Sequence, residues 1–297
     1  MQADTQSFVL ADGRNVDVLL GGDSGGFALV MHHGTPSDAT TFSDWDGACR
    51  DRALRLVCAS RPGYATSTRK PGRDVAGAAR DTAEILDRLG HRAFVTAGWS
   101  GGGPHALACA ALLPDRCRAA ATLAGVGPSA QPDLDFVAGM GPENVEEFGA
   151  AAAGEPALQA WMDKNGKALR NTVTGANLVE ALGGLVPQVD KDVLVGGFAD
   201  HMAAVMRRAL EHGLDGWIDD DLAFARPWGF DAADVRASVT VWQGDLDLMV
   251  PFAHGRWLVR RLPNAHARMA PGHGHLSLVT RYRGEILDDL LARSGPR

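Results

Sequence analysis

Short, wholly apolar runs that alternate with segments of helical spacing are the feature that most constrains the fold of this chain. Three of them lie in its first third: FALVM at 27–31, LRLVCA at 54–59 and AFVTA at 93–97. An uninterrupted apolar run of this length is typical of a strand buried on both faces. Between the last two runs, residues 75–89 carry apolar side chains at helical spacing. This alternation predicts an α/β fold with a mostly parallel central sheet and helices on both faces.

The same alternation extends on both sides of these runs. Asp74 is expected to cap the 75–89 helix at its start, and Gly90 to end it. Before the first run, two strands should form a hairpin across the turn at 11–13. The further elements that we expect are hairpin strands at 7–10 and 16–20, helices at 103–113, 252–261 and 276–292, and strands at 119–123, 238–242 and 267–269.

The stretch 129–226 interrupts this rhythm. It holds no comparable strand-like run and is rich in Ala, Leu, Met and charged residues, which predicts mostly helix. A chain of 297 residues suits one large domain with an insertion, because domains beyond ~250 residues usually split or acquire lids. We therefore expect an α/β core over 1–128 and 227–297, and a helical cap over 129–226 at the carboxyl edge of the sheet.

The net charge of −7 is unevenly distributed. The stretch 129–226 contains 7 Lys+Arg and 16 Asp+Glu, a balance of −9, and the rest contains 22 and 20, a balance of +2. An acidic chain is a poor partner for nucleic acid. Solvated helix faces would explain the acidic cap. A sharper hypothesis is that the cap attracts cationic or amine-bearing substrates.

Cysteine usage and the N-terminus favour a cytoplasmic location. Cys49, Cys58, Cys109 and Cys117 form no C-x-x-C pair and no dense framework. The first residues, MQADTQSFVLADGRN, lack the basic and apolar regions of a signal peptide. No run approaches the ~18 apolar residues of a membrane span, so no membrane partner is expected. No pattern in the sequence predicts an oligomeric state.

The segment Gly98-Trp99-Ser100-Gly101-Gly102 is the most specific indication of function in the sequence. It is a G-x-S-x-G that directly follows the 93–97 strand and opens a helix. A strand-to-helix turn this sharp strains its central residue and needs small neighbours. The Ser100 hydroxyl should then be exposed at the carboxyl edge of the sheet, at a helix N-terminus that favours an anion. Although a glycine-rich loop is the alternative, this context predicts a catalytic nucleophile.

A serine nucleophile needs a base, and the base needs an orienting acid. The segment 242–251 places Asp245 and Asp247 in the loop that leaves the 238–242 strand. The segment 271–277 places His273 and His275 after the last strand. The chain therefore offers the order Ser, Asp, His, with two candidates for each partner of the serine.

These motifs resemble those of the α/β-hydrolase superfamily, in particular its capped members such as esterases, proline iminopeptidases and epoxide hydrolases. The resemblance covers nearly all of the sheet-forming sequence and is weak across 129–226. It implies the α/β-hydrolase fold. The family's G-x-x-D-x-x-V-P pattern selects Asp247 as the acid, and its G-H pattern selects His275 as the base.

The resemblance also implies an oxyanion hole. The segment His32-His33-Gly34-Thr35-Pro36 is similar to the family's H-G-x loop, so the backbone N–H groups of Thr35 and Gly101 would hold the developing oxyanion. We interpret His32 and His33 as loop histidines that hydrogen-bond nearby backbone. Metal ligation by these two residues is the alternative. We expect no metal, because His273-Gly274-His275 also lacks a metal-binding context, and no cofactor, because no phosphate loop is present.

Apolar and aromatic side chains of the cap and the core are candidates for a substrate pocket, although most of them could instead fill the core of the cap. These candidates are His33, Trp99, Met140, Trp161, Met202 and Met206.

The serine at position 100 separates this chain from the relatives that use an aspartate at the same turn, such as haloalkane dehalogenases and epoxide hydrolases. Serine implies acyl transfer, so we predict hydrolysis of a carboxylic ester or lactone through an acyl-enzyme. An aminopeptidase or amidase of the proline iminopeptidase type is the alternative, although HHGTP departs from that group's H-G-G-P-G loop. A non-catalytic ligand receptor is a third hypothesis.

Overall fold

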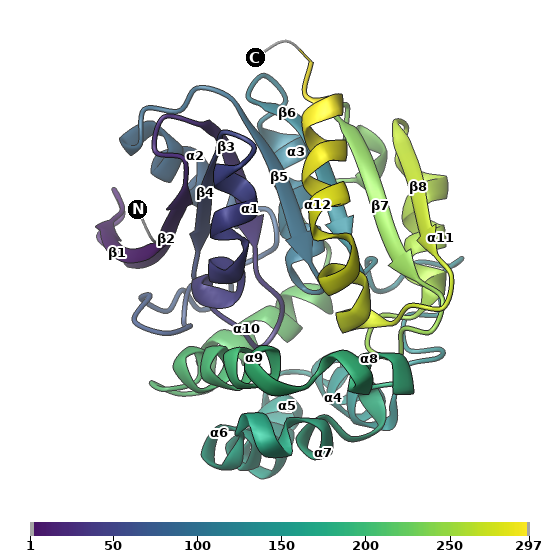
Figure 1. Cartoon of the computed structure of the whole chain (residues 1–297). Coiled ribbons are helices and arrows are strands. Elements are labelled where there is room, and N and C mark those ends of the chain that lie inside the picture. Colours follow the sequence, from purple (N-terminus) through teal and green to yellow (C-terminus); the bar gives the residue numbers. More distant parts are fainter. Residues whose placement is uncertain (1–2, 296–297) are drawn as a thin grey trace.

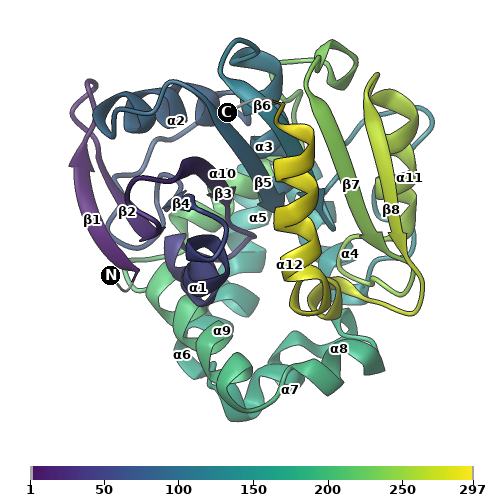
Figure 2. The same ribbon diagram turned by 45° about the horizontal axis from the view of Figure 1, so that its top comes forward.

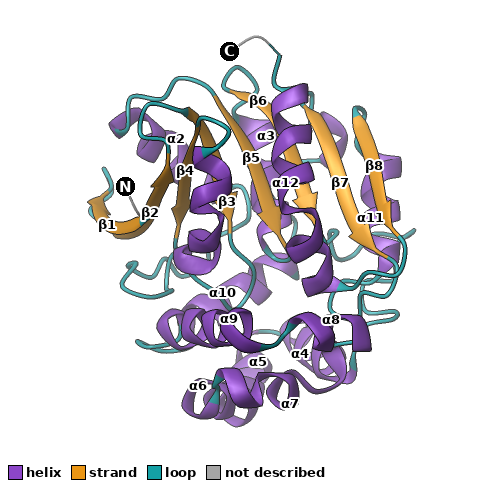
Figure 3. Ribbon diagram, viewed as in Figure 1, coloured by secondary structure: helices purple, strands orange, loops and turns teal. Residues whose placement is uncertain are grey.

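A single eight-stranded sheet organises the protein, for which a computed structural model describes residues 3–295. The strands lie in the order β1-β2-β4-β3-β5-β6-β7-β8 (Figures 1 and 3). β2 is antiparallel to β1 and β4, and all other neighbours are parallel. The mostly parallel sheet is therefore confirmed. The strands are β1 (Asp4–Val9), β2 (Asn15–Gly22), β3 (Phe27–His32), β4 (Leu54–Ala59), β5 (Phe94–Trp99), β6 (Cys117–Leu123), β7 (Ser238–Gly244) and β8 (Ala265–Ala270).

Helices cover both faces of this sheet. Strand residues alternate between the faces: Leu29 and Met31 of β3 pack on the side of α1 and α12, whereas Ala28 and Val30 pack on the side of α2, α3 and α11. Figure 1 shows α1 and α12 in front of the sheet. This period-two burial explains why the strands are apolar throughout. The covering helices are α1 (Asp46–Arg50), α2 (Gly77–Arg88), α3 (Gly102–Leu112), α11 (Phe252–Arg261) and α12 (His275–Arg293).

The start of α2 differs from our expectation. Its N-cap is Ala76, not Asp74, because residue 76 already has helical angles (φ −61°, ψ −29°). Asp74 Oδ1 nevertheless accepts a hydrogen bond from the N–H of Gly77 at 2.8 Å, and so satisfies a donor of the first turn from outside the helix. Gly90 has φ +78° directly after the helix, which confirms its predicted place.

The stretch 129–226 is helical, as predicted, and contributes no strand to the sheet. Its helices gather beyond the carboxyl ends of the central strands, below the sheet in Figures 1 and 3, and the tilted view of Figure 2 shows α7 and α8 below α12. They are α4 (Pro142–Ala153), α5 (Glu155–Trp161), α6 (Lys167–Thr172), α7 (Leu178–Leu182), α8 (Gln188–Val193), α9 (Gly196–Ala209) and α10 (Asp215–Phe224).

Two features are absent from residues 3–295, a membrane-spanning helix and a metal-binding cluster. None of the helices in this range combines the length and hydropathy that a membrane span requires. Within the same range, His, Cys, Asp and Glu side chains form no group of three or more that could hold a metal ion.

Candidate active site

Ser100 occupies the sharp turn between β5 and α3. Its φ of +57° lies in the left-handed region, which a non-glycine residue adopts only where the surrounding structure enforces it. The flanking glycines make the turn sterically feasible. A Cβ at Gly98 would lie 2.0 Å from the carbonyl oxygen of Gly102, and one at Gly102 would lie 2.0 Å from the carbonyl oxygen of His32. The G-x-S-x-G spacing is thus a steric requirement of this turn.

Asp247 and His275 form a buried hydrogen-bonded pair. His275 Nδ1 donates to Asp247 Oδ2 at 2.8 Å, and both side chains are almost fully enclosed. Asp247 Oδ1 accepts from the N–H groups of Met249 at 2.9 Å and Val250 at 2.8 Å. The carboxylate is therefore fixed by its own loop, and the imidazole is held as the tautomer that leaves Nε2 free to accept a proton.

The two alternative partners lie elsewhere. Asp245 Oδ1 accepts a hydrogen bond from the N–H of Gly272 at 2.7 Å, and so joins two loops. The His273 ring packs edge-on against Tyr282, with centroids 5.2 Å apart. The structure thus brings together Asp247 with His275, and not Asp245 with His273.

The charge of Asp247 raises the proton affinity of His275. Burial disfavours the imidazolium, but the Asp247 carboxylate and its hydrogen bond outweigh this and raise the pKa of His275 above its ordinary value. The Trp99 ring packs against the imidazole with centroids 5.4 Å apart. Ser100 and His275 line one cavity. Their side chains share no hydrogen bond within the described residues, and such contacts commonly tighten only when substrate binds.

Asp190, which the sequence did not single out, positions His275 from α8. Its Oδ2 accepts from the N–H of His275 at 2.7 Å, and its Oδ1 from the N–H of Ser277 at 2.8 Å. A carboxylate there satisfies free donors at the start of α12. A Cβ at Gly274 would lie 2.4 Å from Asp190 Oδ2, so the approach depends on that glycine. No local signal marks Asp190, because it lies 85 residues before its partner.

The predicted oxyanion loop lies directly beside the Ser100 turn. A Cβ at Gly34 would be 3.4 Å from Cβ of Ser100, and one at Gly101 would be 2.5 Å from Thr35 Oγ1. The two segments that should supply the oxyanion donors, at Thr35 and Gly101, are therefore in contact.

A buried arginine holds this loop from behind. Arg61 donates to the carbonyl oxygens of His33 at 2.5 Å and Gly34 at 2.7 Å. The same guanidinium pairs with Asp220 of α10 at 2.6 Å, and Thr35 Oγ1 donates to Asp220 Oδ2 at 2.7 Å. A residue of the inserted stretch thus fixes the predicted oxyanion loop, and the sequence pattern did not reveal this contact.

Asp220 is the centre of a larger buried cluster. Arg73 Nη1 lies 2.6 Å from its Oδ1, and the Tyr64 hydroxyl donates to its Oδ2 at 2.9 Å. Burial opposes ionisation of this carboxyl, but Arg61 and Arg73 hold the pKa of Asp220 well below its usual range. One carboxylate between two guanidiniums leaves the cluster positively charged.

His32 and His33 have different surroundings. His33 Nδ1 donates to the carbonyl oxygen of Gly34 at 2.8 Å, and its Nε2 accepts from the N–H of Arg61 at 3.0 Å. His32 ends β3, and its Nε2 lies 3.6 Å from Cys109 Sγ. Burial, with a contribution from Arg61, lowers the pKa of His32 to about 3 and that of His33 well below its ordinary value, so both rings are neutral.

Comparison with known proteins decides the family. A family model described as the alpha/beta hydrolase fold matches residues 28–282, which is most of the chain. The chain belongs to the α/β hydrolase fold family. No curated protein sequence matches this α/β hydrolase.

Solved structures show the same fold over the whole length of this hydrolase. An alpha/beta hydrolase fold protein from Nakamurella multipartita is 22% identical, with a TM-score of 0.66 and coverage of 99% and 100% of the two chains. The esterase RhEst1 from Rhodococcus sp. ECU1013 is 18% identical, with a TM-score of 0.68 and coverage of 99% and 100%. Epoxide hydrolase A from Mycobacterium thermoresistibile is 19% identical, with a TM-score of 0.68 and coverage of 98% of both chains. At these identities the likeness concerns the fold alone.

The hydrolase has a cavity of about 380 Å³ between the Ser100 turn and the inserted helices. The predicted oxyanion residues Thr35 and Gly101 line it together with Ser100 and His275. Of the predicted pocket residues, Trp99, Trp161, Met202 and Met206 line this cavity.

Two predicted pocket residues do not line the cavity at Ser100. His33 is fully buried, and its ring accepts a hydrogen bond from the N–H of Arg61. Met140 is buried in the segment before α4 and is not among the described residues that line the cavity. Both predictions rested on proximity in sequence to a motif or on residue type, and neither fixes which way a side chain points.

Two buried acids of the hydrolase line the same cavity and were not predicted. They are Glu147 of α4 and Asp221 of α10. Trp217 Nε1 donates to Glu147 Oε1 at 2.5 Å, and the Glu147 and Asp221 side chains share a hydrogen bond. Burial raises the pKa of Glu147 to about 7, and burial together with the Glu147 charge raises the pKa of Asp221 well above its usual range. Such a pair retains a proton near neutral pH.

Proposed function

We propose that this protein is a serine hydrolase that cleaves a carboxylic ester or lactone through an acyl-enzyme intermediate. The observation that carries this proposal is the buried Asp247–His275 hydrogen bond of 2.8 Å beside a strained Ser100 in one cavity. A serine with φ +57° at the start of a helix, with an oriented base beside it, has the parts that nucleophilic acyl transfer needs.

Each residue then has one role in the proposed reaction. Ser100 Oγ attacks the carbonyl carbon while His275 Nε2 accepts the hydroxyl proton, and Asp247 stabilises the imidazolium. The oxyanion accepts hydrogen bonds from the N–H groups of Thr35 and Gly101. The tetrahedral adduct collapses, and His275 returns the proton to the leaving alkoxide oxygen. A water molecule repeats both steps on the acyl-enzyme and releases the acid.

Labelling with a fluorophosphonate probe tests this proposal. Folded wild-type protein should form one covalent adduct at Ser100 and hydrolyse p-nitrophenyl acyl esters, and the Ser100→Ala variant should do neither. A protein that binds acyl esters but neither labels nor turns over would instead be a non-catalytic receptor on this fold.

The Glu147–Asp221 pair favours a second candidate, a substrate that carries an ammonium group. A cavity wall with buried carboxyls, and with no arginine or lysine among its described lining residues, favours a cation, in keeping with the acidic balance of 129–226. Amine-bearing esters and the aminoacyl amides that an aminopeptidase cleaves both fit this description. The second candidate therefore differs from the first in the substrate, not in the proposed triad.

Paired substrates separate these two candidates. Proline anilides and p-nitrophenyl esters of neutral acids should be compared on the same enzyme preparation. If the second candidate holds, the anilide or an amino-acyl ester has the higher kcat/KM, and Glu147→Gln lowers that preference. A preference for neutral esters that Glu147→Gln does not change would favour the first.

Two broader proposals accompany this function. We retain 129–226 as a cap domain, since its helices close the cavity over Ser100. We also propose a cytoplasmic location, because Cys49, Cys58, Cys109 and Cys117 are all buried, free thiols.

A further inference from the structure

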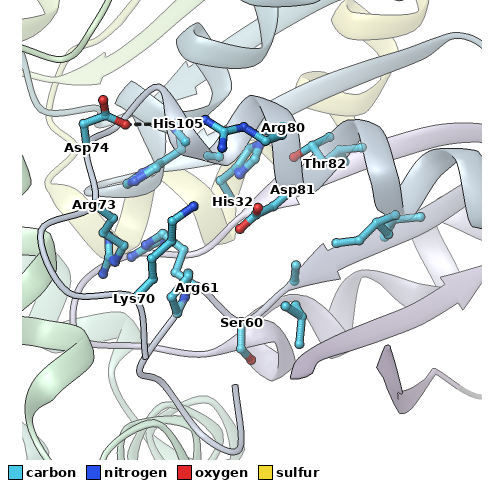
Figure 4. A pocket seen from close by; sticks show the side chains of 18 of the residues that line it. His32, Ser60, Arg61, Lys70, Arg73, Asp74, Arg80, Asp81, Thr82 and His105 are labelled. Atoms are coloured by element: carbon cyan, nitrogen blue, oxygen red, sulfur yellow. Dashed lines mark hydrogen bonds between the residues drawn. The ribbon is translucent and has the colours of Figure 1, made fainter. Parts of the chain in front are cut away.

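A second cavity lies behind the oxyanion loop, on the α2 side of the sheet. It has a volume of about 260 Å³ and shares no lining residue with the cavity at Ser100. Figure 4 shows Lys70 and Arg73 on the loop before α2, Arg80 on α2 and His105 on α3 around it. An apolar cavity of roughly 150 Å³ already holds a molecule such as benzene, so this one has room for a small organic ligand.

The electrostatic balance around this cavity is positive. Four basic side chains line it, whereas the lining acids are Asp74 and Asp81. Asp81 is paired with Arg14 at 2.6 Å, and Asp220 is shared between Arg61 and Arg73. The lining bases are Arg61, Lys70, Arg73 and Arg80.

Lys70 and Arg80 carry the unbalanced charge. Neither makes an ion pair or hydrogen bond with another residue of the described range 3–295. Lys70 is half-buried, and Arg80 is exposed. Two cations that form no ion pair within this range, with Asp12 as a more distant neighbour of Lys70, favour an anionic group in the cavity.

Two buried polar atoms at the cavity also lack partners. Arg73 has a side chain only 5% exposed, and its Nε–H meets no acceptor among the described residues. His105 Nδ1 donates to the carbonyl oxygen of Gly101 at 2.8 Å, so its buried Nε2 is an acceptor, and it is unpartnered as well. Buried polar groups are normally satisfied, and these two would be satisfied by a ligand oxygen and by a ligand or water hydroxyl.

The remaining wall is apolar. Val16 and Val57 pack in one cluster with Ile85 of α2, Val30 packs in another with Leu86, and all five line the cavity. A basic rim over an apolar wall suits an amphipathic anion better than an inorganic one, because an ion such as phosphate would leave this apolar wall uncovered.

We propose that this second cavity binds a small carboxylate with a short alkyl chain and that its occupancy changes turnover at Ser100. The carboxylate contacts Lys70, Arg73 and Arg80, and the alkyl chain lies along the apolar wall. The binding half of this proposal does not depend on the proposed function, whereas the effect on turnover rests on it.

The link to the active site passes through two side chains. Arg61 lines the second cavity and donates to the carbonyl oxygen of Gly34 and to Thr35 Oγ1. His105 lines it as well and binds the carbonyl oxygen of Gly101. Each segment that would supply an oxyanion donor is thus held from behind by a residue of the second cavity. A ligand that shifts either side chain changes the position of a donor.

Calorimetric titration with hexanoate, and with hexanol as its uncharged counterpart, tests the binding half. We expect hexanoate to bind one site and to bind Lys70→Gln/Arg80→Gln about tenfold or more weakly, since each charge-assisted contact is worth more than a neutral one. Equal affinity for hexanol, or unchanged hexanoate affinity in the double variant, would overturn the proposed carboxylate site.

Two matched substitutions decide which cavity is occupied. Ala78→Phe fills the second cavity from α2, and Ala181→Phe adds the same ring at the wall of the cavity at Ser100. Hexanoate binding should be lost in the first and kept in the second, with circular dichroism confirming that both fold. The reverse pattern would assign hexanoate to the active-site cavity and overturn the proposal.

Turnover tests the second half. With a p-nitrophenyl ester as substrate, saturating hexanoate should change kcat of wild type and leave kcat of Ala78→Phe unaltered. Binding to the second cavity without any change in kcat would overturn the coupling while leaving the binding site in place. If neither wild type nor any variant turns over the ester, the proposed function is contradicted. The titration still tests binding to the second cavity in that case.

Discussion

Arg61 Nη2 lies 2.6 Å from Asp220 Oδ2, and this buried ion pair joins the inserted stretch to the loop beside Ser100. Asp220 belongs to α10, whereas Arg61 follows β4. Because the same guanidinium binds the carbonyl oxygens of His33 and Gly34, the inserted helix and the oxyanion loop share one support. The position of the inserted helix over the cavity at Ser100 and the position of the proposed oxyanion loop are therefore not independent in this fold.

Asp220→Ala should destabilise the protein by about 3–5 kcal/mol, because it leaves Arg61 and Arg73 buried without their counter-ion. Urea unfolding measures this loss. Asp219→Ala on the same helix is the matched control. Its partner Arg69 is 32% exposed and can return to water, so we expect a loss of about 1 kcal/mol or less. Equal losses in the two variants would show that the Asp220 cluster is not a special support.

Asp190→Asn should lower kcat while leaving most of the stability. Its carboxylate holds the N–H groups of His275 and Ser277, and an amide can accept only one of these bonds through oxygen. A misplaced imidazole slows proton transfer without removing the substrate site, so KM should change less than kcat. Asp192→Asn, on the same helix with its carboxylate bonded only to Gln188, serves as the control and should retain wild-type kcat.

Asp247→Asn should lower kcat by about 10⁴, because an amide at this position cannot hold the reactive tautomer of His275. Asp245→Asn should retain most activity, since Asp245 binds only the N–H of Gly272 in the structure. Steady-state kinetics on a p-nitrophenyl ester compares the two. A larger loss in Asp245→Asn than in Asp247→Asn would contradict the Asp247–His275 assignment.

The acidic limb of the pH–rate profile should lie above pH 6.5. His275 works as a base only when neutral, and Asp247 raises the pKa of His275 above that of an ordinary histidine, so kcat/KM rises as the pH passes this raised pKa. In Asp247→Asn the remaining activity should show this limb at lower pH. Glu147→Gln is the control, because the pKa of Glu147 is also near neutrality, at about 7. If the acidic limb disappears in the Glu147→Gln variant, the limb reports Glu147 and not His275.

Two glycine substitutions should act in opposite directions. Gly98→Ala should prevent the native Ser100 turn, because its Cβ would lie 2.0 Å from the carbonyl oxygen of Gly102. Gly149→Ala, within α4 and with no atom within 4 Å of the added Cβ, should stabilise the protein by about 0.5–1 kcal/mol. Thermal unfolding and fluorophosphonate labelling measure both effects. A labelled, stable Gly98→Ala variant would refute the steric argument.

The sequence by itself determined the sheet and the Ser100 turn. Apolar runs such as 27–31 are long enough to form strands buried on both faces, and the glycine at 98 records a steric need that its chain neighbour Gly102 creates. These are local properties, so a pattern of adjacent residues carries them. The Asp247 and His275 assignments rested on family resemblance, and the structure places these two side chains 2.8 Å apart.

Only the tertiary structure decided how the site is supported. Asp190, Asp220 and Asp221 look like any other acids of an acidic helical stretch, and nothing near them in the sequence distinguishes a solvated carboxylate from a buried one. Asp220 is buried against Arg61, Asp190 against the start of α12, and Asp221 against Glu147. Each of these partners lies 74 to 159 residues away in the chain. Contacts of this kind form when the chain brings distant segments together, and a pattern of neighbouring residues does not encode them.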